Sequence, residues 1–120
     1  MKLLPVIALF LFPCMGAQAG EADILDVSIS CDSPVSCNFT VTVRHEDRGW
    51  EHYANRWEIL DFAGNLIAVR ELAHPHDNEQ PFTRSLAAVG IPGGTNEVVI
   101  RAHDLVHAYG GKELLVKLPR

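Results

Sequence analysis

Six histidines are the residues of this chain best suited to chemistry, and acidic residues lie among them. Neutral imidazole is the commonest metal ligand in proteins, and carboxylate is its usual companion. Groups of both kinds would bind a divalent transition metal if the fold brought them together. The histidines are His45, His52, His74, His76, His103 and His107, and the acidic residues among them are Glu46, Asp47, Glu51, Asp77, Glu79 and Asp104.

Alternation of apolar and polar residues predicts seven short β-strands. Residues 37–44 show it most clearly, with Phe39, Val41 and Val43 on one face and polar residues on the other. No segment combines a helical period with capping residues. The sequence therefore predicts an all-β protein, a single immunoglobulin-like antiparallel β-sandwich of about seven strands. The expected strands are residues 24–30, 37–44, 53–62, 66–72, 82–87, 96–102 and 112–118.

The connections between these strands should place all six histidines at one end of the sandwich. Along an antiparallel up-and-down path, successive connections alternate between the two ends. The connections 45–52, 73–80 and 103–111 therefore share one end, and together they contain every histidine. The turns near Pro34, Gly64 and Pro92 share the other end.

Strand parity selects the candidate ligands. The inward series of residues 39–43 continues to His45, and that of residues 98–102 continues to Asp104. These two strands face each other across an immunoglobulin-like core, so both side chains should point into one space. The candidate metal ligands are therefore His45, His52, Asp104 and His107, followed by His74 and His76. A donor set of imidazole and carboxylate suits iron, copper or zinc.

Each candidate also has a simpler interpretation. A histidine in a polar loop is commonly only solvated, and Pro75 could stiffen a loop whose two imidazoles are exposed. Asp104 could hold its turn through bonds to the local backbone, as Asp often does. His103 has outward parity, and Trp50 and Trp57 are typical packing residues.

Residues 1–19 predict a secretory signal peptide that precedes the fold. Lys2 is followed by an apolar run too short to span a membrane, and Ala17-Gln18-Ala19 supplies small residues for cleavage. We therefore expect a folded domain over residues 20–120 in the periplasm. A lipid anchor at Cys14 is the alternative, although Phe12 and Pro13 before it are not the small residues that such processing usually needs.

Composition argues against several classes of partner. The chain has a net charge of −5, so it lacks the clustered Lys and Arg expected for binding nucleic acid or an anionic membrane surface. A metal ion and a periplasmic protein remain as candidate partners. In an oxidising compartment, Cys31 and Cys37 around a Ser-Pro turn favour a local disulfide, with a pair of thiolate metal ligands as the alternative.

Two segments resemble the desulfoferrodoxin and superoxide reductase family. In one, His45 is followed by Glu51-His52-Tyr53 and a strand that contains Trp57. The other, Asp104-Leu105-Val106-His107, is similar to a Cys-x-x-His element of that family. The resemblance implies an immunoglobulin-like sandwich with a mononuclear iron at one end, bound by His45, His52 and His107. Asp104 stands where that family has its cysteine ligand, and residues 22–31 contain no counterpart of its early histidine.

Three functions are consistent with these patterns. The first is a secreted periplasmic metal-binding protein with a His/Asp site at one loop end. The second is a superoxide-reductase-like mononuclear iron redox protein, in which case the chain would be an oxidoreductase. The third is a metal-free module whose loops bind a protein or peptide through Trp50, Tyr53 and Tyr109.

Overall fold

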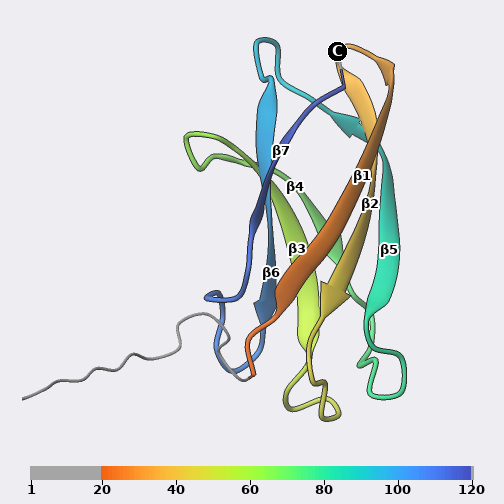
Figure 1. The fold of residues 1–120 in the computed structure, drawn as a ribbon, viewed down its shortest axis with the longest axis vertical. Helices are drawn as coiled ribbons and strands as arrows, with labels where there is room; N and C mark the ends of the chain where they lie inside the picture. The colour runs from red at the N-terminus through yellow and green to blue at the C-terminus, as the bar shows by residue number, and fades with distance from the viewer. Residues whose placement is uncertain (1–19, 120) are drawn as a thin grey trace, which may run out of the picture.

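The computed structural model describes residues 20–119 and shows two antiparallel sheets packed face to face (Figure 1). The predicted signal peptide over residues 1–19 lies outside the described residues. The strands are β1 (Asp23–Ser33), β2 (Ser36–Arg44), β3 (Ala54–Asp61), β4 (Leu66–Glu71), β5 (Phe82–Gly90), β6 (Glu97–Asp104) and β7 (Leu114–Lys117).

The two sheets have the strand orders β1-β2-β5 and β4-β3-β6-β7, and every pairing is antiparallel. The predicted seven-strand sandwich is therefore confirmed. Over residues 20–119 the structure contains no helix long and apolar enough to cross a membrane.

Apolar side chains from both sheets fill the space between them. Phe39, Val41 and Val43 of β2 are fully buried, as are Trp57 of β3 and Ile100 of β6. Burying a side chain of this size stabilises the fold by about 1.5–3 kcal/mol. The alternation seen in the sequence therefore fixes which face of each strand meets the core, and with it the direction of the residues that follow.

Strand β5 is longer than expected, because a bulge carries it past Ala87. Ala88 has a positive φ of 55°, and its backbone N–H donates to the side-chain oxygen of Asn38 at 2.9 Å. The register between β2 and β5 shifts at this point. The bulge lets Val89 reach the core, so the strand predicted to end at residue 87 continues to Gly90.

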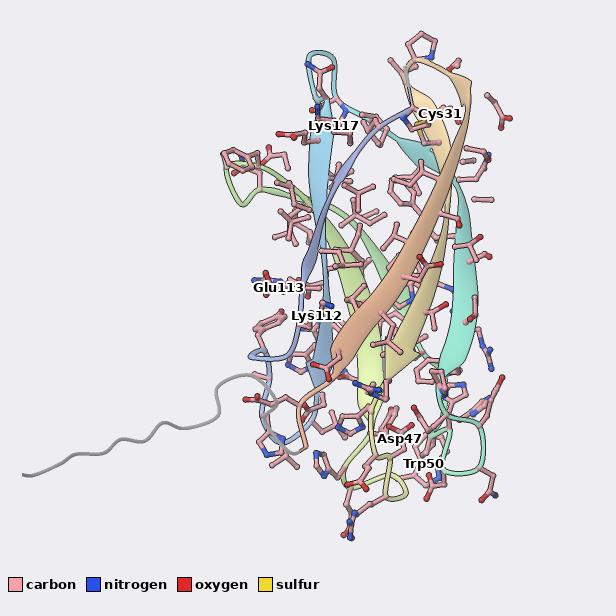
Figure 2. All side chains as sticks on the ribbon, in the orientation of Figure 1. Cys31, Asp47, Trp50, Lys112, Glu113 and Lys117 are labelled. Carbon is pink, nitrogen blue, oxygen red and sulfur yellow. A yellow bond between two sulfur atoms is a disulfide. The ribbon has the colours of Figure 1, made fainter. Side chains whose placement is uncertain are left out.

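The predicted disulfide between Cys31 and Cys37 is confirmed. The two residues are direct cross-strand partners in β1 and β2, so the bond closes that hairpin. Figure 2 labels Cys31 at one end of the sandwich, and Asp47 and Trp50 at the other.

Connections alternate between the two ends, as expected from the sequence (Figure 1). The loops β2–β3, β4–β5 and β6–β7 gather at the end far from the disulfide. Every histidine belongs to one of these three loops or to the strand terminus beside it.

Candidate metal centre

His45, His52 and Asp104 form a cluster at this end of the sandwich. Each offers one ligand atom, and the three atoms all lie within 4.8 Å of one another. His45 directly follows β2 in one sheet, Asp104 ends β6 in the other, and His52 comes from the loop that leads into β3. The expected approach of His45 and Asp104 across the core is therefore observed, with 3.7 Å between His45 Nε2 and Asp104 Oδ2.

Asp47 sets the orientation of the His45 ring. The Nδ1 of His45 lies 2.5 Å from Asp47 Oδ1, and because a carboxylate only accepts, Nδ1 carries the proton. Nε2 therefore faces Asp104, and it also lies 2.8 Å from the carbonyl oxygen of Gly20. A carboxylate behind an imidazole in this way is the usual outer partner of a metal-binding histidine.

The same contacts shift the titration of both groups. Burial alone would lower the pKa of His45, but the hydrogen bond to Asp47 and the charges of Asp47 and Asp104 raise it above 6.5. Burial alone would raise the pKa of Asp47, but hydrogen bonds from His45 and from the backbone N–H groups of His76 and Ala54 lower it. In the metal-free protein His45 is therefore readily protonated, and it then donates to both Asp47 and Gly20.

Asp104 has two roles, one for each oxygen. Its Oδ1 accepts hydrogen bonds from the backbone N–H groups of Val106 at 2.8 Å and His107 at 2.6 Å, so it does hold the turn, as the simpler interpretation expected. Its Oδ2 is buried and has no hydrogen-bond partner among the described residues. One oxygen is thus structural, and the other remains available to a ligand.

His52 closes the third side of the cluster. Its Nε2 lies 3.4 Å from Asp104 Oδ1 but forms no hydrogen bond within residues 20–119, although the atom is buried. The ring meets His45 edge-on, with centroids 4.7 Å apart. Buried polar atoms almost always have a partner, so the unpaired atoms of His52 and Asp104 call for an explanation.

His107 lies at the rim of the cluster, and its side chain is 33% exposed. Its Nδ1 is 3.3 Å from Asp104 Oδ1, and its ring centroid is 5.0 Å from that of His52. A pocket of about 340 Å³, lined by Gly20, Glu46, Arg48, His52 and His107, opens here to solvent. The fourth predicted ligand is therefore next to the cluster but outside the group of three atoms.

His74 and His76 pair with each other, with ring centroids 4.7 Å apart, and do not join that group. His74 is exposed, whereas His76 is 5% exposed and stacks on Phe82 at a centroid distance of 4.0 Å. Burial lowers the pKa of His76, as do the neighbouring charges of Arg84 and His74. The backbone N–H of His76 donates to Asp47 Oδ2 at 2.6 Å, so Asp47 connects this loop to His45.

His103 points away from the cluster, as its outward parity predicted. Its Nδ1 lies 2.6 Å from Asn55 Oδ1, and its ring meets that of Tyr109 edge-on at 5.0 Å. Burial lowers the pKa of His103, as does the nearby charge of Arg56.

Sequence reasoning missed a buried ionic network behind the β6–β7 loop. Glu58 is 4% exposed and accepts hydrogen bonds from Arg56 at 2.7 Å, Arg101 at 2.8 Å and the Tyr109 hydroxyl at 2.8 Å. The usable signal was the outward parity of Glu58 and Arg101, which alternate with inward apolar residues on two strands that the structure pairs directly. Because Tyr109 follows Asp104 and His107 along the chain, the network anchors the loop that carries both.

Comparison with curated proteins finds a relative of this chain. The chain is 40% identical over 96 residues to a protein of Halomicrobium mukohataei described as "Putative lipoprotein". The match covers 80% of this chain and 47% of that protein, so the chain spans about half the length of the curated relative it matches. No family model and no solved structure matches the chain, and the resemblance to desulfoferrodoxins therefore stays a prediction.

Proposed function

We propose that this chain is an exported metal-binding protein, with a divalent transition metal held by His45, His52 and Asp104. The observation that supports the proposal is that two buried atoms beside His45 Nε2, His52 Nε2 and Asp104 Oδ2, have no hydrogen-bond partner among residues 20–119. Leaving a buried polar atom without a partner costs about 1–3 kcal/mol, and more when the group is charged. A cation bound between these atoms would satisfy all three groups at once.

The donor set indicates the class of ion. Two imidazole nitrogens and one carboxylate oxygen suit Zn(II), Cu(II) or Fe(II). Ligand atoms about 2.1 Å from a tetrahedral ion lie about 3.4 Å apart. Since the three atoms here spread to 4.8 Å, binding would draw the side chains inward by about 1 Å, and the His45 Nε2 proton would leave.

The relative supports export rather than a particular compartment. Its description as a lipoprotein fits a protein associated with the cell envelope, and the leader predicted over residues 1–19 fits the same route. We propose a periplasmic location, with cleavage before Gly20. Attachment through Cys14 is the alternative form of processing.

Metal content of the purified protein tests the proposal. The untagged chain is exported with its own leader and purified in its processed form, its metals are measured by elemental analysis, and the metal-free form is titrated with Zn²⁺, Cu²⁺ and Fe²⁺. We expect one equivalent of metal, with affinity reduced at least tenfold in His52→Ala and in Asp104→Asn. The matched control is His103→Gln, which changes a histidine on the outer side of β6 and should leave the affinity unchanged. Absence of binding, or equal binding by all variants, would refute the proposal.

A redox iron centre is the second candidate, favoured by the positions of four residues. The three histidines that by the resemblance would stand at ligand positions of superoxide reductases have ring nitrogens 3.3–3.7 Å from the carboxylate oxygens of Asp104: they are His45, His52 and His107. This candidate requires iron that stays bound on purification and absorbs visible light. A colourless zinc form with no redox activity would exclude it.

A metal-free binding module is the third candidate, supported by the exposed apolar side chains at the same end. Trp50 is 64% exposed and Val106 is 60% exposed. If no metal raises the melting temperature of the protein, this function is the one that remains.

A further inference from the structure

Gly20 contacts the metal centre although it lies far from the other residues in sequence. Its carbonyl oxygen is 2.8 Å from His45 Nε2, the nitrogen that faces Asp104. It also lines the pocket that contains His52 and His107. Gly20 therefore lies at the open side of the cluster, next to His45.

Glycine is the residue that suits this position best. The ring of His107 lies so close that an added Cβ would be 2.5 Å from its Cε1 atom, a distance that real Cβ atoms do not reach. Gly20 also has a φ of +95°, which strains residues with a side chain. The positive φ and the close approach to the His107 ring therefore both favour glycine here, because a side chain would be strained and would push that ring aside.

On the basis of the metal centre proposed above, we propose that Gly20 completes it: cleavage after Ala19 frees the α-amine, which binds the ion together with the Gly20 carbonyl oxygen. His45, His52 and Asp104 supply three donors, which leaves at least one coordination position open. An amine and the carbonyl of the same residue form a five-membered chelate ring with a metal. When the ion takes the place of the proton on His45 Nε2 and that proton is released to solvent, the nitrogen no longer donates to the Gly20 carbonyl oxygen, which becomes free to turn towards the metal.

Processing of the leader would then control the site. Before cleavage, or after attachment at Cys14, the nitrogen of Gly20 is a peptide amide, whose lone pair is delocalised into the carbonyl. Such a nitrogen is a poor donor to a divalent ion. A free amine has a localised lone pair and binds Zn(II) or Cu(II) readily once it is unprotonated.

Three forms of the chain test this inference, and all contain the seven strands. The first begins at Gly20 with a free amine, the second is the same chain with an acetylated amine, and the third retains Ala17-Gln18-Ala19 before Gly20. Each is titrated with Zn²⁺ and with Cu²⁺, and its melting temperature without metal is recorded. We expect at least tenfold weaker binding by both blocked forms, with unchanged melting. Equal affinity of the three forms would overturn the inference and leave the three-residue centre intact.

The same comparison in His52→Ala shows where the amine acts. If the amine binds the ion in this centre, blocking it should have little further effect once His52 is absent. An equal loss in the parent and in the variant would place the amine elsewhere and overturn the inference. No binding by any form would refute the metal centre itself.

Mass spectrometry of the exported protein should give Gly20 as the first residue, and a lipid-modified Cys14 would contradict the inference.

Discussion

Asp47 is the residue that decides which nitrogen of His45 faces the site. It accepts from His45 Nδ1, from the backbone of Ala54 at 3.1 Å and from the backbone of His76 at 2.6 Å, and it is 7% exposed. Three donors from three segments hold one carboxylate, so the His45 ring is fixed before any ion arrives. At the scale of single residues, the site depends on a group that would not itself touch the metal.

Asp47→Asn should weaken metal binding without removing a ligand. The amide of Asn can donate as well as accept, so it no longer enforces the His45 tautomer, and loss of such an outer partner typically costs 10–100-fold in affinity. Titration calorimetry with Zn²⁺ measures the change. The control is Asp26→Asn, an exposed carboxylate on β1. Equal affinity of the two variants would contradict the role given to Asp47.

The raised pKa of His45 predicts opposite effects of pH on stability and on metal affinity. Because the pKa of His45 is higher in the folded than in the unfolded protein, protonated His45 stabilises the fold. This contribution is complete below pH 6.5, the unfolded pKa, and is lost as the pH rises through the folded pKa. The metal-free domain should therefore lose stability as pH rises above 6.5. Metal affinity should increase over the same range, because Nε2 must be unprotonated to bind. Urea unfolding and titrations between pH 5.5 and 8.5 check both slopes, and a flat affinity profile would contradict the involvement of His45.

At the scale of elements, the outer face of the β4-β3-β6-β7 sheet positions the loop that carries Asp104 and His107. Arg101 lies over the ring of Tyr109 at 3.8 Å, and the Tyr109 hydroxyl donates to Glu58. Burial alone would raise the pKa of Glu58, but hydrogen bonds from Arg56, Tyr109 and Arg101 lower it below 4.5. The buried carboxylate of Glu58 on β3 thus holds the β6–β7 loop in place through its hydrogen bond with Tyr109.

Glu58→Gln should destabilise the fold by about 1–3 kcal/mol, because it leaves buried donors without a charged acceptor. It should also change the response to acid. Since the folded pKa is depressed, Glu58 contributes stability above pH 4.5 that is lost as pH falls through the lower folded value. The parent should therefore lose stability more steeply than the variant in acid. Urea midpoints between pH 3 and 7 test this, and parallel curves would contradict it.

The disulfide stabilises the opposite end of the molecule. Replacing both Cys31 and Cys37 by Ser should cost about 2 kcal/mol, because the short loop is no longer closed in the unfolded chain. Metal affinity should stay the same, since the bond joins the β1–β2 hairpin far from the histidine loops (Figure 2). A change in affinity comparable to that of Asp47→Asn would show that the two ends are coupled.

At the scale of the whole molecule, the sequence predicted the elements that depend on local pattern. Alternation in residues 39–43 and 98–102 indicated both the strands and the inward direction of His45 and Asp104, because strand parity carries over into the first loop residue. The gathering of the histidine loops followed from the antiparallel path alone.

Contacts between distant segments could not be predicted in this way. Gly20 meets His45 and His107 because residues 20–22 lie against the β6–β7 loop. The buried position of Asp47 likewise depends on His76, in a loop 29 residues further along the chain. Neither contact can be inferred from residue periodicity or from neighbouring residues in the sequence.

A crystal structure of the metal-loaded domain, with anomalous data at the absorption edge of the bound metal, tests the central claim most directly. We predict one strong anomalous peak about 2.0–2.2 Å from a nitrogen of His45, a nitrogen of His52 and an oxygen of Asp104. A peak at the His74–His76 pair instead, or no peak near Asp104 in a protein that retains metal, would contradict the account.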